Sequence, residues 1–233
     1  MQKSLLILKA VCQLALIAHL ARTRLLQRFP FLAIFFFSHL VWIVAGAIPT
    51  TPVNREEVWQ YGVSVTLAAL VAAFLETVHL SLEHYPGISR QAVWGACGVV
   101  AAISGILGAL EPSNHPTREL LVAQRVLGSA VAVSAIGLLM VLNYFDPRRR
   151  PNVVRHERTM AAMAATTALA AWMFNHKQFV RGADLLNFGN ILYPIIWIWA
   201  LRPEGETDSR PPANPLGRKQ ARAASEQLRE YYD

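Results

Sequence analysis

Several ionisable and amide side chains occur inside long apolar stretches of this chain. Lys9 interrupts one such stretch, and Arg125 has apolar residues on both sides. Ionisable groups in a bilayer are costly and usually face the interior of a helix bundle or a wet cavity. Cationic, hydroxyl and amide groups gathered at one place would bind a small polar or anionic ligand. The candidate ligand-binding residues are Lys9, Gln13, Tyr61, Arg125, Asn187 and Asn190.

Two of these residues also have a purely structural interpretation. The long side chain of Lys9 can carry its ammonium group to the membrane surface, and for this residue we prefer that interpretation. The Arg125 guanidinium can pair with a carboxylate and hold helices together. The carboxylates on offer are Glu57, Glu119 and Asp184. Structural and ligand-binding roles therefore both stay open for Arg125.

A second group of residues could hold a metal ion or a haem. Glu76 and His79 have the Glu-x-x-His spacing that places both side chains on one helix face, and di-iron helical proteins use such a pair twice. Here the pair occurs once. His19 and His39 lie on different apolar stretches and could ligate a haem iron. We prefer the alternative that His39 is a core histidine bonded to a neighbouring helix, so no cofactor is expected.

The sequence carries no motif of a known catalytic class. It has no glycine-rich phosphate loop, no HExxH, no GxSxG and no paired metal-ligand motif. The last apolar stretch has no lysine for a retinal Schiff base, because Lys177 precedes it. Cys12 and Cys97 lie in apolar stretches and form no CxxC pair. We assign no catalytic residue and favour a non-enzymatic role.

Seven apolar stretches must position these side chains. Hydrophobic residues make up 54% of the 233 residues and charged residues only 16%, below the roughly 25% charged of soluble domains. Stretches of about 20 such residues can cross the roughly 30 Å hydrocarbon layer as helices. We expect an all-α bundle of seven transmembrane helices over residues 1–202. The predicted spans lie near residues 3–21, 30–48, 57–81, 91–110, 118–144, 157–175 and 183–201.

Basic residues alternate between the two sides of the predicted bundle. Most of them follow spans one, three and five, namely Arg22, Arg24, Arg28, Arg90, Arg148, Arg149, Arg150, Arg155 and Arg158. Because basic loops stay in the cytoplasm, we expect the N-terminus outside and the C-terminus inside a bacterial inner membrane. Four candidate residues then share one depth, roughly 9–10 Å below the outer boundary at about 1.5 Å of rise per residue: Lys9, Tyr61, Arg125 and Asn190.

The net charge of +7 is thus mainly a topology signal, with some attraction to anionic lipid head groups. No nucleic-acid recognition module accompanies the basic residues, so we expect no nucleic-acid partner. The partners we expect are the lipid bilayer and a cytoplasmic or membrane protein. Residues 203–233 are polar and predict a flexible cytoplasmic tail, for which a short helix over 217–232 and a frayed end are both open.

Small residues in the fourth span recur at helical spacing, at Gly98, Ala102, Gly105 and Ala109. They share one helix face that would let a neighbouring backbone approach closely. This pattern predicts that the fourth span lies in the core of the bundle.

Three short segments carry a resemblance. They are Arg28-Phe29-Pro30-Phe31 before the second span, the stretch from Glu119 to Arg125, and Leu201-Arg202-Pro203-Glu204 after the seventh. In these segments and in its layout the chain resembles a group of bacterial seven-helix membrane proteins without assigned activity. The resemblance implies a seven-helix fold and carries over no activity.

Three functions remain open from the sequence. The first is a receptor-like or sensory membrane protein that binds a small polar or anionic ligand in its outer half and signals to a cytoplasmic partner. The second is a non-catalytic subunit of a larger membrane complex. The third is a haem- or metal-binding redox protein that uses His39 with His19 or Glu76.

Overall fold

The chain folds into a bundle of helices. The computed structural model describes residues 2–47, 52–110, 116–145, 149–176 and 178–206, together with Ala223 and Glu226. These residues form seven α-helices and two short 3-10 helices, which confirms the all-α prediction. The helices are α1 (Gln2–Arg22), η1 (Leu25–Gln27), α2 (Pro30–Ala47), α3 (Pro52–Ser81), α4 (Pro86–Leu110), α5 (Pro116–Phe145), α6 (Pro151–Asn175), α7 (Phe179–Ala200) and η2 (Pro203–Glu206).

Proline opens most of the helices. Pro30, Pro52, Pro86, Pro116 and Pro151 are each the first residue of a helix. Proline suits this position because its fixed φ is already helical and the first turn needs no backbone N–H partner. As a result α3, α4 and α6 begin several residues before the predicted spans. The predicted connections were too long, and Arg90, Arg155 and Arg158 lie on helices.

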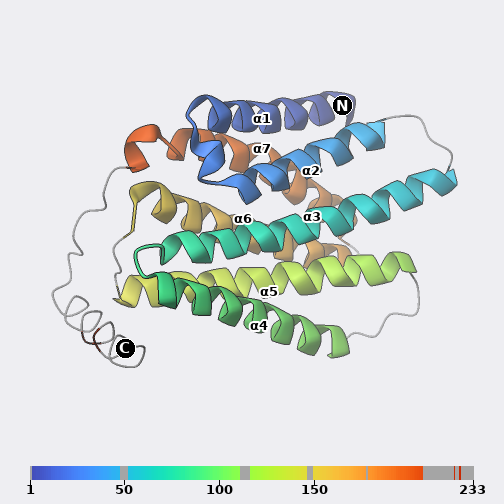
Figure 1. Ribbon diagram of the computed structural model, residues 1–233. Coiled ribbons are helices and arrows are strands. Elements are labelled where there is room, and N and C mark those ends of the chain that lie inside the picture. The colour runs from blue at the N-terminus through green and yellow to red at the C-terminus, as the bar shows by residue number, and fades with distance from the viewer. Residues whose placement is uncertain are drawn as a thin grey trace.

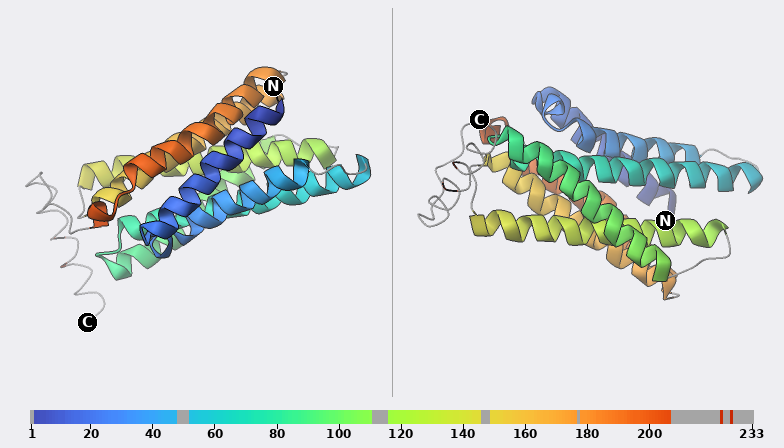
Figure 2. Two further views of the ribbon diagram at one scale, coloured as in Figure 1. Left: turned by 90° about the horizontal axis from the view of Figure 1, so that it is seen from above. Right: turned by 60° about the horizontal axis from the view of Figure 1, so that its bottom comes forward.

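The helices run alternately in opposite directions (Figure 1). Each packs against its neighbours in the sequence, α7 closes the ring onto α1, and α3 also contacts α5 and α6. Seen from above, α1 lies between α7 and α2 (Figure 2). We call the end at which α1, α3, α5 and α7 finish the arginine end, and the other the far end. The arginine end carries Arg28, Arg149, Arg150 and Arg202.

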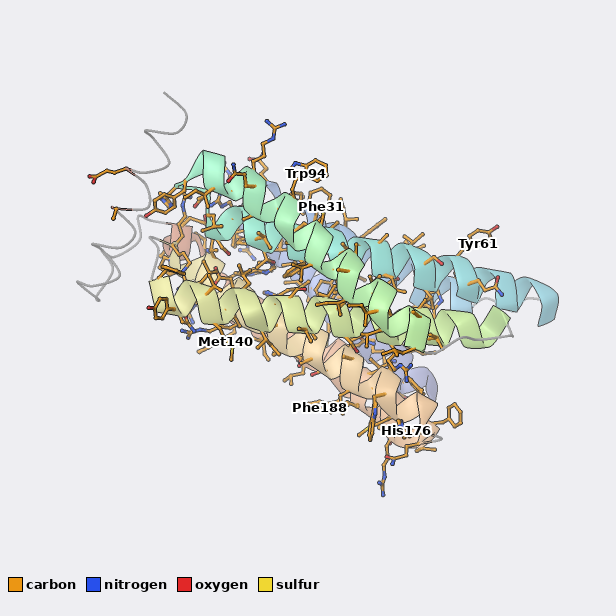
Figure 3. The ribbon with its side chains drawn as sticks, turned by 90° about the horizontal axis from the view of Figure 1, so that it is seen from below. Phe31, Tyr61, Trp94, Met140, His176 and Phe188 are labelled. Carbon is orange, nitrogen blue, oxygen red and sulfur yellow. The ribbon has the colours of Figure 1, made fainter. Side chains whose placement is uncertain are left out.

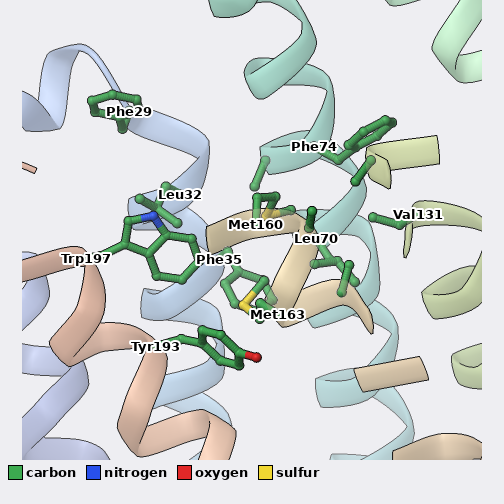
Figure 4. Close-up of a cluster of buried hydrophobic side chains, with 14 of the residues drawn as sticks. Phe29, Leu32, Phe35, Leu70, Phe74, Val131, Met160, Met163, Tyr193 and Trp197 are labelled. Atoms are coloured by element: carbon green, nitrogen blue, oxygen red, sulfur yellow. The ribbon is translucent and has the colours of Figure 1, made fainter. Parts of the chain in front are cut away.

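Large buried side chains fill the centre of the bundle, and Figure 4 shows some of them. Phe36 of α2 meets Trp197 of α7 edge to face, with ring centroids 5.4 Å apart. Phe74 of α3 and Met160 of α6 are fully or almost fully buried in the same cluster. Close contacts of this kind hold membrane helices together, because lipid offers no hydrophobic driving force between them.

Among the described residues, four helices are long and apolar enough to cross a membrane, at Ser4–Arg22, Gln60–Ser81, Gly87–Leu110 and Val122–Phe145. The apolar part of α2, Pro30–Ala45, is shorter. Large apolar side chains also point outward from several helices, as Figure 3 shows for Phe31, Trp94, Met140 and Phe188. Exposed apolar surface on this scale is that of a membrane protein.

The prediction that the fourth span lies in the core is wrong. Only 6% of the apolar window of α4 is buried, against 56% for α3. Helix α4 packs mainly against α3 and α5, on the outside of the ring. On its small-residue face Gly105 is exposed and Gly98 is half-buried, and a Cβ at either glycine would meet nothing within 4 Å.

Candidate functional site

A cavity of about 210 Å³ lies inside the far half of the bundle. Every α-helix except α4 contributes to its described lining. Its polar lining residues are Lys9, His39, Thr66, Gln124, Thr167, Asn187 and Asn190. Its apolar lining residues are Phe35, Trp42, Val63, Leu67, Leu70, Phe174, Ala183 and Leu186. None of these described lining residues is acidic, so the ammonium group of Lys9 is the one full charge among them.

Lys9 points into the bundle rather than to the surface. Only 9% of the residue is exposed, and its Nζ donates a hydrogen bond to Asn187 Oδ1 across the α1–α7 contact. The interpretation in which Lys9 reaches the membrane surface is therefore wrong. Asn190 lies one turn further along α7 and lines the same cavity.

Behind His39 lies a fully buried amide. Gln13 Nε2 lies 2.7 Å from His39 Nδ1, which makes His39 a core histidine bonded to a neighbouring helix, as expected. Within the described part of the chain, Gln13 Oε1 has no hydrogen-bond partner. Turning the amide would leave Nε2 without an acceptor instead. One polar atom of Gln13 therefore stays open to a further partner, and a buried polar atom of this kind is uncommon in proteins.

Two of the predicted ligand-binding residues lie outside the cavity. Tyr61 is 74% exposed and points away from the bundle (Figure 3). Arg125 is half-buried on α5, where its neighbour Gln124 lines the cavity in its place. The structure thus brings together Lys9, Asn187 and Asn190, with Gln13 next to them through His39.

The residues of the predicted metal or haem alternative lie apart. His19 Nε2 donates to the Leu201 carbonyl at 2.8 Å, and His79 Nδ1 lies 2.9 Å from the Ser89 hydroxyl. Over the described residues, no group of three His, Cys, Asp or Glu side chains could hold a metal ion. This placement gives the haem alternative no support.

Glu76 has a different role, as the cap of a neighbouring helix. Its carboxylate oxygens accept the backbone N–H groups of Phe31 and Leu32 at 3.0 and 3.1 Å. These groups belong to the first turn of α2, where backbone N–H groups have no partner within the helix. The negative charge also lies at the positive end of the helix dipole. Glu76 therefore fastens the start of α2 to α3.

Sequence reasoning missed a polar column on α6. His156 is fully buried, with Trp197 Nε1 donating to its Nδ1 at 3.1 Å. Thr77 donates its own proton to the Ala73 carbonyl, so His156 Nε2 donates to Thr77 Oγ1 at 3.0 Å. Both ring nitrogens are satisfied, and these roles define a neutral imidazole with its proton on Nε2.

Glu157 follows in the same column. Its carboxylate accepts hydrogen bonds from Ser81 Oγ and Arg149 Nη1, each at 2.6 Å. The ion pair is shielded from solvent, with side-chain exposures of 7% for Arg149 and 1% for Glu157. A buried pair of this kind persists only when its remaining polar atoms are also bonded.

A ring of alternating charges closes the arginine end. Arg28 contacts Glu83, and its Nε lies 3.3 Å from Glu206 Oε2. Arg150 contacts the same two carboxylates, at 3.0 Å to Glu83 and 3.2 Å to Glu206. The ring joins the start of α2, the α3–α4 connection, the start of α6 and the last described segment of the chain.

Asn152 fixes that last segment, Arg202–Glu206, which we call the latch. Asn152 Nδ2 donates to the Arg202 carbonyl at 2.7 Å and to Glu206 Oε1 at 2.8 Å. Gly205 is buried against it, since a Cβ there would lie 2.1 Å from Asn152 Oδ1. The described packing thus extends through Glu206, beyond the boundary predicted at residue 202. The predicted helix over 217–232 lies outside the described residues, apart from Ala223 and Glu226.

One signal could have revealed the column. Pro151 is a favourable first helical residue, and a helix that begins there places Asn152 and His156 one turn apart on the same face. The predicted span began at residue 157 and so left both in a connection.

The comparisons with known proteins supply no family for this chain. No protein-family model matches it, no curated protein matches it, and no solved structure matches it.

Proposed function

We propose that this chain is a seven-helix membrane receptor that binds a small anionic ligand in its central cavity. Ligand binding shifts α7, and the shift reaches a cytoplasmic protein partner at the arginine end. The cavity has the composition of a ligand site, because apolar walls surround a few convergent polar groups. The size of the cavity suits a small molecule or the head group of a larger one.

The proposal rests on the surroundings of the Lys9 ammonium group. Its ammonium group is buried beside neutral amides, and the described lining offers it no carboxylate. A buried cation without a counter-ion is unfavourable at low dielectric, so an anion that enters the cavity gains a strong electrostatic interaction. The amide of Gln13, which keeps one open polar atom, bonds to His39 of the cavity lining.

Helix α7 supports the relay. Asn187 and Asn190 face the cavity, and the following turns carry Tyr193 and Trp197, which bond to α6. Pro194 lies within this segment. Proline cannot donate a hydrogen bond to the carbonyl four residues earlier, here that of Asn190, so the helix is weakest next to the cavity. A change at the asparagines can therefore tilt the part of α7 that leads to the latch.

The same proposal gives the chain a direction and a location. The far end, with the N-terminus and the cavity, faces outward, and the arginine end faces the cytoplasm of a bacterial cell across its inner membrane. The clustering of arginines at one end supports this direction. All seven helices then cross the bilayer, including α6 and α7, which are stabilised there by their contacts with the other helices.

The test is a thermal-stability series on the full chain in lipid nanodiscs. The probes are straight-chain carboxylates from butanoate to dodecanoate and the corresponding primary alcohols. We expect the carboxylates to raise the melting temperature of the wild type and to lose this effect with Lys9→Met. Arg181→Met is the control, because it removes an exposed positive charge from the same end. If folded Lys9→Met keeps the full effect, Lys9 does not bind the ligand.

A second candidate function, a subunit of a larger membrane complex, is favoured by α4. Its small-residue face is exposed and has room for a neighbouring helix. Native mass spectrometry of gently extracted membranes separates the two candidates. A stable complex with another membrane protein, lost on Gly105→Leu, would support the subunit function, and a free chain that binds carboxylates would support the receptor.

A further inference from the structure

A second hollow lies on the lipid-facing side of the α2–α3 contact. This open hollow has a volume of about 530 Å³, and its walls include Ile34, Phe37, Val41, Ala45, Tyr61 and Val65. The one hydroxyl that α2 contributes, from Ser38, donates to the Phe35 carbonyl at 2.8 Å and so is already bonded. We call this hollow the α2–α3 groove. Its walls suit an alkyl chain.

Trp42 is the one described residue that lines both the central cavity and the groove. Its indole lies against the backbone of α3 at Gly62, where a Cβ would come within 2.0 Å of Trp42 Cδ1. On the cavity side its ring centroid lies 5.6 Å from that of His39. The side chain therefore forms the partition between the polar cavity and the lipid-facing groove.

From this arrangement we infer that the ligand is a single-chain amphiphile with a carboxylate head, such as a long-chain fatty acid. The head binds Lys9 in the cavity, and the alkyl chain passes Trp42 and lies in the α2–α3 groove. The inference rests on the proposed function and names the ligand class of the same site. It also gives an access route, sideways from the bilayer between α2 and α3.

The charge of Lys9 in the cavity and the position of the groove beside that cavity favour this ligand over others. A cavity of about 210 Å³ holds a carboxylate with a short chain but not a long one. The groove lies on the other side of the Trp42 side chain and faces lipid, so an alkyl chain enters it from the cavity when the indole turns aside. The acyl chain of a bulk phospholipid could fill the groove but would leave the Lys9 ammonium unpaired. A short water-soluble carboxylate would pair with Lys9 but leave the groove unused.

The experiment compares chain lengths on two matched variants. Val65→Trp places a large side chain in the groove, and Val133→Trp places the same side chain on the exposed surface of α5, away from it. Both valines are more than half exposed, so both variants should fold. Dissociation constants for butanoate, dodecanoate and dodecanol are measured in nanodiscs. Melting curves confirm that each variant is folded.

We expect wild type and Val133→Trp to bind dodecanoate roughly tenfold or more tightly than butanoate, since each buried CH₂ adds affinity. Val65→Trp should remove this advantage and leave butanoate binding unchanged. Lys9→Met should remove the preference for dodecanoate over dodecanol.

The outcomes separate the inference from the proposed function. If butanoate and dodecanoate bind equally well and Val65→Trp has no effect, the proposed function stands and the amphiphile inference is overturned. If dodecanol binds as well as dodecanoate, the groove takes any alkyl chain and the inference is overturned as well. If no carboxylate binds, both fail.

Discussion

Two kinds of buried polar residue occur in this protein, and their hydrogen bonds separate them. Both ring nitrogens of His156 are bonded within the protein, so the residue is complete without a ligand. Lys9 and Gln13 are not complete, because the first has no carboxylate in its cavity lining and the second leaves one amide atom open. Satisfied networks stabilise a fold, whereas open polar groups are where binding gains most.

Replacing His156 tests this distinction at a single residue. In His156→Phe the ring still packs on Phe29, whose centroid lies 5.0 Å away, but the Trp197 N–H loses its acceptor. We expect a loss of about 1–3 kcal/mol in the free energy of unfolding, the cost of one buried unsatisfied group. Reversible unfolding in mixed micelles gives this value. His176→Phe, on the surface in Figure 3, should change it little. Equal effects would show that the His156 hydrogen bonds carry no stability.

Alanine substitutions at two glycines, Gly62 and Gly98, test the packing of Trp42 on α3. In Gly62→Ala the new methyl group overlaps the Trp42 indole, so α2 and α3 must separate or the indole must move. Overpacking of this kind typically costs about 1–3 kcal/mol. Gly98→Ala meets open space on α4 and should be neutral or slightly stabilising, because alanine favours helix. Melting temperatures of the two variants in nanodiscs test the prediction. A stable Gly62→Ala protein would mean that Trp42 does not lie on α3.

At the scale of elements, the sequence predicts the existence of each helix better than its surroundings. Long apolar stretches located all seven helices, while the proline-opened starts of α3 and α6 came earlier than expected. The error at α4 has a physical cause. A helix face of small residues has the same sequence pattern whether it packs on protein or faces lipid, because the two surroundings are equally apolar.

The sequence predicted the depth of the candidate site along the helices but not which side chains point into it. Counting residues along each span placed Lys9 and Asn190 at one depth, and both line the cavity. Tyr61 and Arg125 share that depth but point elsewhere, because each residue turns the helix by about 100° and small shifts rotate a side chain out of the site. On α5 a shift of one residue decides the lining, because Gln124 lines the cavity and Arg125 does not.

Glu76 allows a prediction about one helix end. In Glu76→Ala the Phe31 and Leu32 N–H groups lose their acceptors at the start of α2. We expect a loss of about 1–2 kcal/mol, as for other N-terminal caps. Glu76→Gln should lose less, since the amide oxygen still accepts one bond but the charge at the helix dipole is gone. Urea or thermal unfolding of the three proteins gives the order. Identical losses for Ala and Gln would attribute the whole effect to charge.

At the scale of the whole molecule, the ligand cavity and the latch lie at opposite ends of α7. Between them, Tyr193 and Trp197 bond to α6, and the Leu201 carbonyl bonds to His19 of α1. Under the receptor proposal, a shift of α7 acts on Arg202–Glu206, which follows it directly. The charge ring and Asn152 hold this segment in place.

Opening the latch should expose its peptide bonds to protease. Glu206→Gln removes the charge that Arg28 and Arg150 share, and Asn152→Ala removes the bonds to Arg202 and Glu206. We expect a Glu-specific protease to cleave both variants after Glu204 several times faster than the wild type, because cleavage requires local opening. Arg90→Ala, an exposed arginine of α4 at the same end, is the control and should leave the rate unchanged. If the receptor proposal is correct, a bound carboxylate should alter the wild-type rate and leave the rate of folded Glu206→Gln unaltered. Unchanged cleavage in both latch variants would show that these polar contacts do not hold the segment, and the relay through α7 would then have no switch to act on.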